Sequence, residues 1–280
     1  MTTPPPVAAD LDRVAGAVLA DPAGTLLATD FDGVLAPIVA DPEAATADPA
    51  AMAALVRVSG LVGRVVVITG RPVRTAVRLG ALAGRPGLER LTVLGQYGVE
   101  RWDAETDTYD IPPAPAVMTE LEARLPAVLS EHGWPDAKLE HKGRALAVHT
   151  RQLADPRRAF DELSGPVTAL AEGLGLHTEP GKLVLEVRAP GMDKGIALRR
   201  VLAEAGARVV VYAGDDLGDV PAFQVVREWH ANEGRGIAVF SGPGEGEPLP
   251  ALTDLADVVV DGTVGIAAWL DALADRLEAG

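Results

Sequence analysis

The chain contains no cysteine, which excludes disulfide bonds, thiolate nucleophiles and zinc sites built on cysteine. It also has no hydrophobic run longer than a strand, so no segment of the sequence is long enough to cross a bilayer. Basic residues are few, because 25 Lys and Arg stand against 40 Asp and Glu and the formal net charge is −15. Nucleic acids and anionic membranes both attract positive charge. We therefore expect neither nucleic acid nor a membrane as a partner.

The remaining composition is that of a folded, soluble protein. The 280 residues are 48% hydrophobic and 23% charged, enough for one large domain or two modest ones. The first residues, Met1–Asp10, are rich in proline and lack the basic start of a signal peptide. Together with the absence of cysteine and of a membrane span, this predicts a cytoplasmic location.

Short β-branched runs alternate with longer segments of helical period, a pattern typical of a parallel sheet covered by helices. The expected strands are Leu26–Thr29, Val65–Thr69, Leu91–Gly95, Val209–Ala213, Ile237–Phe240 and Val258–Val260. The expected helices are Pro49–Val58, Pro72–Leu82, Lys194–Ala205, Val220–Ala231 and Val264–Leu277. An antiparallel hairpin, Tyr97–Trp102 with Thr108–Ile111, is expected at a sheet edge. The predicted fold class is therefore α/β.

The middle of the chain breaks this alternation. A stiff proline-rich segment, Ile111–Pro115, is a good hinge, and Ala189-Pro190-Gly191 returns the chain to the alternating pattern. Between them we expect, in order, the helix Val117–Glu131, the paired strands Lys138–Lys142 and Ala145–Arg151, the helix Pro156–Leu174 and the strand Leu183–Arg188. The sequence thus predicts an α+β insertion at residues 113–189 within an α/β domain formed by residues 1–112 and 190–280.

Two aspartates follow the first expected strand in the sequence Asp30-Phe31-Asp32-Gly33. Ligands of open α/β sheets bind beyond the carboxyl ends of the strands, where Thr69 and Asp215 also fall. Paired carboxylates at the end of a buried strand are costly without a cation or a chemical task. The alternative is that they form a turn or cap a helix.

Phosphoryl transfer is a chemistry that suits this pair. A strand-end aspartate can attack phosphorus and carry the phosphoryl group as an acyl phosphate, and we assign this role to Asp30. Asp32 would protonate the leaving oxygen and then take a proton from the hydrolytic water. Because the acid must start protonated, its surroundings have to favour the neutral form.

Two further polar signals fit an anionic substrate. Thr69-Gly70-Arg71 joins an expected strand to a helix, where a hydroxyl and free N–H groups bind anions. Thr69 would hydrogen-bond a phosphoryl oxygen, with an ordinary N-cap threonine as the alternative. Lys194 opens an expected helix, where the helix dipole disfavours a cation unless an anion lies nearby. The alternative for Lys194 is a solvated surface lysine.

A cluster of carboxylates follows the strand Val209–Ala213 in the sequence Gly214-Asp215-Asp216-Leu217-Gly218-Asp219. Helix capping explains one of these acids. Three of them near Asp30, Asp32 and a dianionic substrate would repel strongly without a hard divalent cation, and Mg²⁺ fits. We expect Asp30, the main-chain carbonyl of Asp32, and Asp215 as ligands, with Asp219 in support.

In these residues the chain resembles the haloacid dehalogenase-like phosphohydrolases. Their four motifs match Asp30–Gly33, Thr69, Lys194 and Asp215–Asp219 in this order. Within that superfamily the chain resembles the trehalose-6-phosphate phosphatases, through the stretches Asp30–Val39, Thr69–Arg71, Gly95–Glu100, His149–Arg151, Leu185–Arg188 and Gly191–Gly195. The resemblance implies a Rossmann-like core with a mobile cap inserted between the second and third motifs.

The chain departs from that family pattern at three positions. Gly218 and Val220 stand where the fourth motif commonly has Thr and Glu, and Val34 stands where Thr is commoner. We expect catalysis to survive these changes. In the cap, five residues are candidates for binding sugar hydroxyls, with charged positions on a solvent-exposed hairpin face as the alternative: Glu140, Lys142, His149, Arg151 and Glu186. Gly70 and Arg71 are further candidates for substrate binding.

The resulting hypothesis is a Mg²⁺-dependent phosphatase that hydrolyses trehalose 6-phosphate, the last step of trehalose biosynthesis, through an aspartyl-phosphate. The substrate is a small phosphorylated sugar, and the sequence identifies no protein partner. A related capped phosphatase acting on sucrose phosphate or a glycosyl phosphoglycerate is the competing enzyme hypothesis. A phosphomutase and a non-catalytic sugar-phosphate sensor are also compatible with the fold. A sensor would be expected to lose Asp30 or Asp32, and both are present.

Overall fold

A computed structural model describes residues 15–39, 41–233, 235–242 and 249–280. The expectation about Met1–Asp10 lies outside these residues. The chain forms two compact units, of which the larger comprises Met1–Ile111 and Asp193–Gly280 and the smaller comprises Pro112–Met192. Each unit has its own sheet.

An eight-stranded sheet forms the centre of the larger unit, with the strand order β12-β11-β10-β1-β2-β3-β4-β5. Neighbouring strands from β12 to β3 pair in parallel, and β4 and β5 pair antiparallel at one edge. The strands are β1 (Thr25–Thr29), β2 (Arg64–Ile68), β3 (Thr92–Gly95), β4 (Glu100–Asp103), β5 (Thr108–Asp110), β10 (Val209–Gly214), β11 (Gly236–Gly242) and β12 (Val258–Asp261). The prediction of a parallel α/β core with an antiparallel edge hairpin is confirmed.

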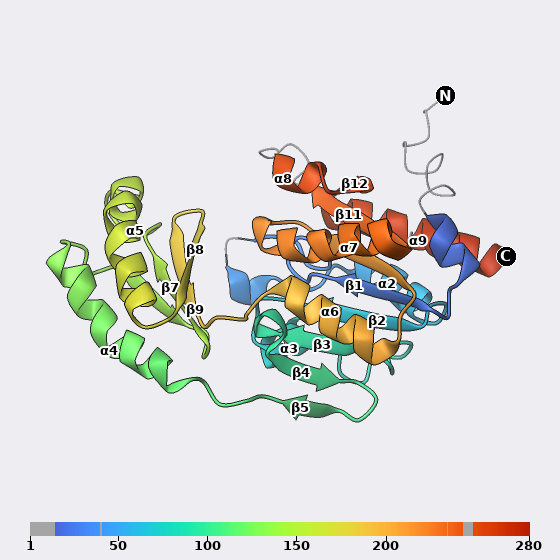
Figure 1. Cartoon of the computed structure of the whole chain (residues 1–280), viewed down its shortest axis with the longest axis horizontal. Helices are drawn as coiled ribbons and strands as arrows, with labels where there is room; N and C mark the ends of the chain where they lie inside the picture. The colour runs from blue at the N-terminus through green and yellow to red at the C-terminus, as the bar shows by residue number, and fades with distance from the viewer. Residues whose placement is uncertain (1–14, 40, 234, 243–248) are drawn as a thin grey trace. The chain divides into compact units, whose positions relative to one another are not determined.

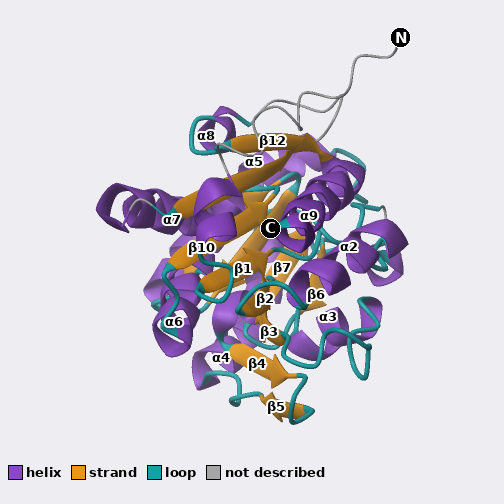
Figure 2. Ribbon diagram, turned by 90° about the vertical axis from the view of Figure 1, so that its right-hand side faces the viewer, coloured by secondary structure: helices purple, strands orange, loops and turns teal. Residues whose placement is uncertain are grey.

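Helices cover both faces of this sheet, as Figure 2 shows. Successive side chains of a strand point to opposite faces, so Leu27 and Val211 pack with α2, α3 and α9, whereas Leu26 and Val210 pack with α6, α7 and α8. The helices are α2 (Pro49–Ser59), α3 (Val73–Leu79), α6 (Lys194–Ala205), α7 (Val220–Glu233), α8 (Pro250–Thr253) and α9 (Gly262–Ala279). The part of the chain that the structure describes also has short 3₁₀ turns at η1 (Pro42–Ala44), η2 (Gln96–Gly98) and η3 (Leu217–Asp219), and residues 15–20 are helical.

The smaller unit is an α+β unit with a four-stranded antiparallel sheet in the order β6-β7-β9-β8 (Figure 1). Its elements are α4 (Ala116–Glu131), β6 (Lys138–His141), β7 (Ala145–His149), α5 (Pro156–Gly173), β8 (His177–Gly181) and β9 (Val184–Arg188). Leu146 and Val187 are buried on the face that α4 and α5 cover. By alternation, Ala147 and Glu186, which lie opposite each other, point to the other face of the sheet.

Local predictions differ from the structure at several places, among them strand β8, Tyr97 and the end of helix α3. Strand β8 is not predicted by the sequence, because His177-Thr178-Glu179-Pro180-Gly181 is polar and contains proline and glycine, which strands disfavour. Tyr97 does not belong to the edge hairpin but to η2, and β4 begins at Glu100. Helix α3 ends at Leu79 rather than Leu82, because Gly80 caps it and Ala81 has a positive φ of 45°.

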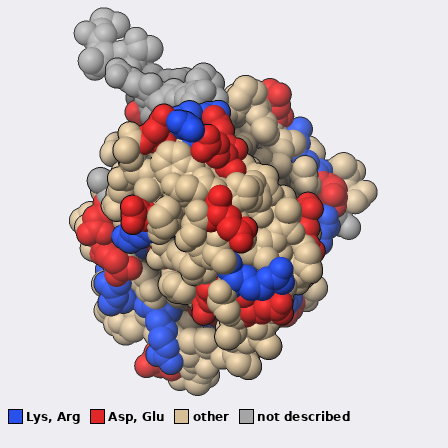
Figure 3. Space-filling model, turned by 90° about the vertical axis from the view of Figure 1, so that its left-hand side faces the viewer, with Lys and Arg blue, Asp and Glu red and all other residues tan. Residues whose placement is uncertain are grey.

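Two surface features bear on partners. On the face drawn in Figure 3, the described acidic and basic side chains lie interspersed, without a continuous basic area. Across the residues that the structure describes, every helix is too short or too polar to traverse a bilayer.

Candidate active site

Asp30 lies at the carboxyl end of β1, in the position expected from the sequence. Its N–H donates to the carbonyl of Ala213 at 2.8 Å, which extends the parallel pairing of β1 and β10 by one residue. The N–H of Phe31 donates to Asp30 Oδ1 at 2.6 Å. The residue is only 4% exposed. The strand pairing therefore fixes this carboxylate beside the end of β10.

Lys194 is buried and directly contacts Asp30, so it is not a solvated surface lysine. Helix α6 begins at Lys194 because Asp193 caps it, accepting from the N–H groups of Gly195 and Ile196. The Lys194 ammonium donates to Asp30 Oδ2 and to Asp219 Oδ1, both at 2.7 Å. The ammonium at the helix start thus has two anionic partners. Their negative charge offsets the free-energy cost of burying the ammonium and its repulsion by the positive end of the helix dipole.

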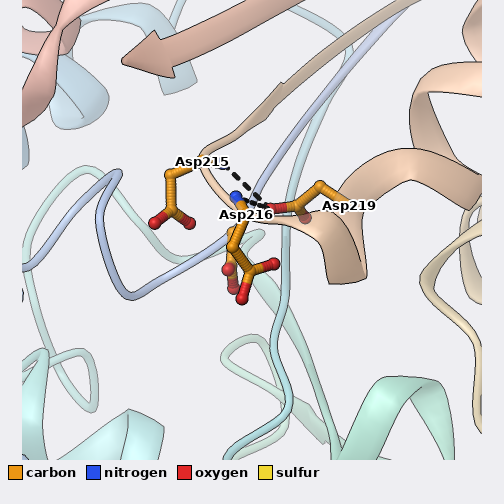
Figure 4. A group of neighbouring side chains, drawn as sticks. Asp215, Asp216 and Asp219 are labelled. Atoms are coloured by element: carbon orange, nitrogen blue, oxygen red, sulfur yellow. Dashed lines mark hydrogen bonds between the residues drawn. The ribbon is translucent and has the colours of Figure 1, made fainter. Parts of the chain in front are cut away.

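Both oxygens of the Asp219 carboxylate are bound by protein groups. Oδ1 accepts from Lys194 and from the Tyr212 hydroxyl at 2.6 Å, while Oδ2 accepts from the N–H groups of Asp215 and Asp216 at 2.9 and 3.2 Å. Figure 4 shows this carboxylate directed at the backbone of its two neighbours, with the Asp215 carboxylate pointing away from it. Asp219 is fully buried. It therefore shapes the loop and holds Lys194.

Four carboxylates come close enough to hold one cation. Ligand oxygens of Asp30, Asp215, Asp216 and Asp219 all lie within 4.8 Å of one another. Gly33 makes this approach possible, because a Cβ there would lie 2.0 Å from Asp215 Oδ2. Burial, reinforced by the neighbouring carboxylates, raises the pKa of Asp30 and of Asp215 well above the usual range.

This cluster fits a hard divalent cation. No described residue donates a hydrogen bond to the Asp215 carboxylate, so its oxygens remain available as ligands. The donors are all oxygen, which suits Mg²⁺, and a cation would relieve the repulsion among the carboxylates, which adds to burial in raising the pKa of Asp30 and of Asp215. Asp216, which the family resemblance implies as a metal-binding acid, is exposed and also caps η3 by accepting from the N–H of Gly218.

Asp32 and Arg71 form an ion pair at the rim of the site. Arg71 Nε donates to Asp32 Oδ2 at 2.6 Å and Nη2 donates to Oδ1 at 2.7 Å. This contact is bidentate and occupies both carboxylate oxygens of Asp32. The Asp32 side chain therefore points at Arg71 and lies outside the group of four carboxylates.

Thr69 directly follows β2 and is 1% exposed. Its hydroxyl oxygen accepts from the N–H of Arg71 at 3.2 Å. The α3 start is instead capped by Glu100, whose carboxylate accepts from the N–H of Val73 at 2.6 Å. Thr69 thus caps its own loop rather than the helix, and its hydroxyl proton is left without an acceptor among the described residues.

The candidate sugar-binding residues lie within the smaller unit, and the structure brings four of the five together. His149 and Glu140 are 2.8 Å apart, Lys142 donates to Glu186 at 2.6 Å, and Lys142 lies 4.0 Å from Glu140. The hydrogen bond from His149 lowers the pKa of Glu140. Arg151 is separate from this cluster, since its Nε donates to the carbonyl of Lys182 at 2.9 Å.

Tyr212 is a site residue that the sequence motifs do not include. It is fully buried in β10, and its hydroxyl donates to Asp219. A tyrosine within the otherwise apolar run Val209–Ala213 is the signal that could have found it, because a buried phenol needs a hydrogen-bond partner.

Comparisons with known proteins identify the family. The trehalose-phosphatase family model matches residues 28–258. A trehalose-6-phosphate phosphatase from Escherichia coli (strain K12) is 29% identical over 252 residues, covering 89% of this chain and 86% of that protein. A trehalose-phosphate phosphatase from Mycobacterium avium (strain 104) is 30% identical over 265 residues, covering 90% of this chain but only 62% of that protein.

Solved structures show the same fold. The trehalose-6-phosphate phosphatase of Aspergillus fumigatus aligns with a TM-score of 0.70 at 20% identity, covering 96% of this chain and 98% of that one. A haloacid dehalogenase-like hydrolase from Bacteroides thetaiotaomicron aligns with a TM-score of 0.53 at 16% identity, covering 88% and 98%. Through the family model and these relatives, the chain belongs to the trehalose-phosphatase family and is a phosphoric monoester hydrolase.

Proposed function

We propose that this phosphatase hydrolyses trehalose 6-phosphate to trehalose and phosphate, with Mg²⁺ as cofactor and an aspartyl-phosphate intermediate, in the cytoplasm. The observation that carries the mechanism is the buried Asp30 carboxylate, held by Lys194 within a group of four carboxylates. Membership of the trehalose-phosphatase family supports the substrate.

The proposed reaction has two steps. An oxygen of Asp30 attacks phosphorus, and the bond from phosphorus to the sugar oxygen breaks while Asp32 gives that oxygen its proton. Asp32 then takes a proton from water, whose oxygen attacks phosphorus and breaks the acyl-phosphate bond. Inorganic phosphate leaves and the Asp30 carboxylate is restored.

Arg71 has to release Asp32 before these two reaction steps can occur. In the structure the guanidinium is bound to Asp32 on both carboxylate oxygens. A phosphoryl group carries more negative charge than a carboxylate and is also bound by guanidinium in bidentate fashion. We therefore propose that the arriving substrate takes over Arg71, which frees the Asp32 carboxyl group to reach the leaving oxygen.

The ligands proposed for Mg²⁺ are the carboxylates of Asp30 and Asp215 and the main-chain carbonyl of Asp32, with Asp219 in support. Asp216 is an additional candidate from its place in the cluster. When bound, the ion neutralises the carboxylates and stabilises negative charge on the phosphoryl oxygens.

Sugar recognition is assigned to the smaller unit. Glu140, Lys142, His149 and Glu186 place hydrogen-bond donors and acceptors side by side on the sheet face that α4 and α5 leave uncovered. A non-reducing disaccharide offers many hydroxyls and no carbonyl, so charged donors and acceptors suit it. Arg151 lies outside this cluster, so we propose it only as a secondary contact of the sugar.

A Mg²⁺-dependent phosphate-release assay over a panel of sugar phosphates tests the substrate. We expect trehalose 6-phosphate to give the highest kcat/KM, above sucrose phosphate, a glycosyl phosphoglycerate and glucose 6-phosphate. A clear preference for another ester would replace the trehalose assignment. Binding without hydrolysis would indicate a sensor, and dependence on a sugar bisphosphate would indicate a mutase.

Glu186→Ala is expected to separate sugar recognition from chemistry. Loss of a charged hydrogen bond to a sugar hydroxyl should lower kcat/KM for trehalose 6-phosphate about 30-fold, with less than about threefold change for 4-nitrophenyl phosphate. Steady-state kinetics on both esters measures this.

The matched control is Glu120→Ala in α4, where the glutamate makes an exposed pair with Arg124. It should leave both rates unchanged. Equal losses on the two esters in the Glu186 variant would show that Glu186 does not contact the sugar.

A further inference from the structure

The turn η2 contains three consecutive residues with positive φ: Gln96 at 48°, Tyr97 at 56° and Gly98 at 97°. Only glycine adopts this region freely, so the first two residues hold a strained backbone. Such strain persists where surrounding contacts over-determine the conformation, and it gathers at functional sites.

The strained turn holds the loop Thr69-Gly70-Arg71 by its carbonyl groups. The N–H of Tyr97 donates to the carbonyl of Thr69 at 2.9 Å, and the N–H of Gln96 donates to that of Arg71 at 2.8 Å. The Gln96 side-chain amide lies 3.4 Å from the carbonyl of Gly70. Residues of η2 thus donate hydrogen bonds to all three carbonyl groups of the loop.

This arrangement leaves hydrogen-bond donors of the same loop available. Within the described residues, neither the N–H of Gly70 nor the hydroxyl proton of Thr69 has an acceptor. Donors without a protein acceptor at the carboxyl end of a strand suit an oxyanion.

Tyr97 and Gly98 fix the turn between the loop and helix α6. A Cβ on Gly70 would lie 2.8 Å from both Cζ and the hydroxyl oxygen of Tyr97, so the phenol ring packs directly on this glycine. A Cβ on Gly98 would lie 2.4 Å from the Cβ of Ala197 in α6, and Arg200 donates to the carbonyl of Gly98 at 2.7 Å. Helix α6 also carries Lys194.

We propose that Tyr97 is a positioning residue for phosphoryl binding. Its ring sets the orientation of Gly70, so that the Gly70 N–H and the Thr69 hydroxyl are directed at a phosphoryl oxygen, and the strained turn keeps this loop in register with the helix of Lys194. This inference rests on the proposed phosphoryl-transfer function and adds the turn as a component of that site.

Replacing Tyr97 by glycine tests the proposal, because it relieves the strain while removing the ring. We expect inorganic phosphate to bind about tenfold more weakly in titration calorimetry with Mg²⁺, and KM for 4-nitrophenyl phosphate to rise similarly, without a lower Tm. Tyr97→Phe keeps the ring and should stay within about threefold of the parent. The matched control is Ala81→Gly, which relieves a positive φ of 45° elsewhere in the same unit and should leave phosphate binding unchanged.

A double-mutant cycle with Gly70→Ala decides whether Tyr97 acts through Gly70. The added Cβ meets the ring, so this variant alone should weaken phosphate about tenfold, while the double variant should be no worse than either single one. Three results would each overturn the proposal. The losses of phosphate affinity in the two single variants could multiply in the double variant, phosphate binding could stay unchanged in Tyr97→Gly, or Tyr97→Phe could bind phosphate as weakly as Tyr97→Gly. Since inorganic phosphate and a small ester are the probes, a wild-type protein that rejects trehalose 6-phosphate would refute the substrate assignment without affecting this result.

Discussion

Asp30→Asn is expected to abolish turnover, with at least a 10⁴-fold (order-of-magnitude) loss of kcat, because an amide cannot form the acyl phosphate. The fold should persist, since Lys194 keeps Asp219 as a partner and one of four crowded carboxylates becomes neutral. Phosphate release with Mg²⁺ measures the rate, and circular dichroism and Tm measure the fold.

Trapping of the intermediate provides the matched comparison for this variant. Asp32→Asn removes the proposed base for hydrolysis and the proposed acid of the first step but keeps the nucleophile. Labelled 4-nitrophenyl phosphate, whose leaving group needs no proton, should therefore still phosphorylate this variant, and acid quenching should recover the phosphorylated protein. Asp30→Asn should recover none. Retained turnover in Asp30→Asn, or label on that variant, would remove Asp30 as the nucleophile.

Removal of divalent cations is expected to have the second largest effect. Chelation should lower activity by at least 10³-fold (order of magnitude), because Asp30, Asp215 and Asp216 would then face a dianionic substrate without a compensating cation. Adding Mg²⁺ back should restore activity. In the absence of substrate, Mg²⁺ should also raise the Tm, because a cation that binds only the folded cluster stabilises it.

Asp215→Asn tests whether the Asp215 carboxylate is a metal ligand. Its carboxylate accepts no hydrogen bond from a described residue, so the substitution should weaken the Mg²⁺-induced rise in Tm without unfolding the protein. Asp254→Asn is the control, because Asp254 is exposed in the same unit and lies outside the cluster. An unchanged Mg²⁺ response in Asp215→Asn, or full activity in chelator, would contradict the metal assignment.

Local patterns were sufficient for most of the core. The strands next to Asp30, Thr69 and Asp215 are short, mostly apolar runs bounded by turns, and parallel pairing places their carboxyl ends at one edge. The proximity of Asp30 and Asp215 followed from this rule, whereas Lys194 begins a helix and its contact with Asp30 depends on how that helix packs. Strand β8 escaped prediction because its stability comes from pairing with β9 rather than from its own residues.

The α/β core, the inserted α+β unit and the elements that carry the polar residues can be predicted from the amino-acid sequence, because hydrophobic period and turn residues act within a few positions. Tertiary packing sets how those residues are used: Asp219 binds Tyr212, Lys194 and two N–H groups through its oxygens, and Arg71 binds Asp32. It also decided that Tyr97 lies on Gly70. The physical reason is that hydrogen-bond partners far apart along the chain are chosen by packing, which no local pattern encodes.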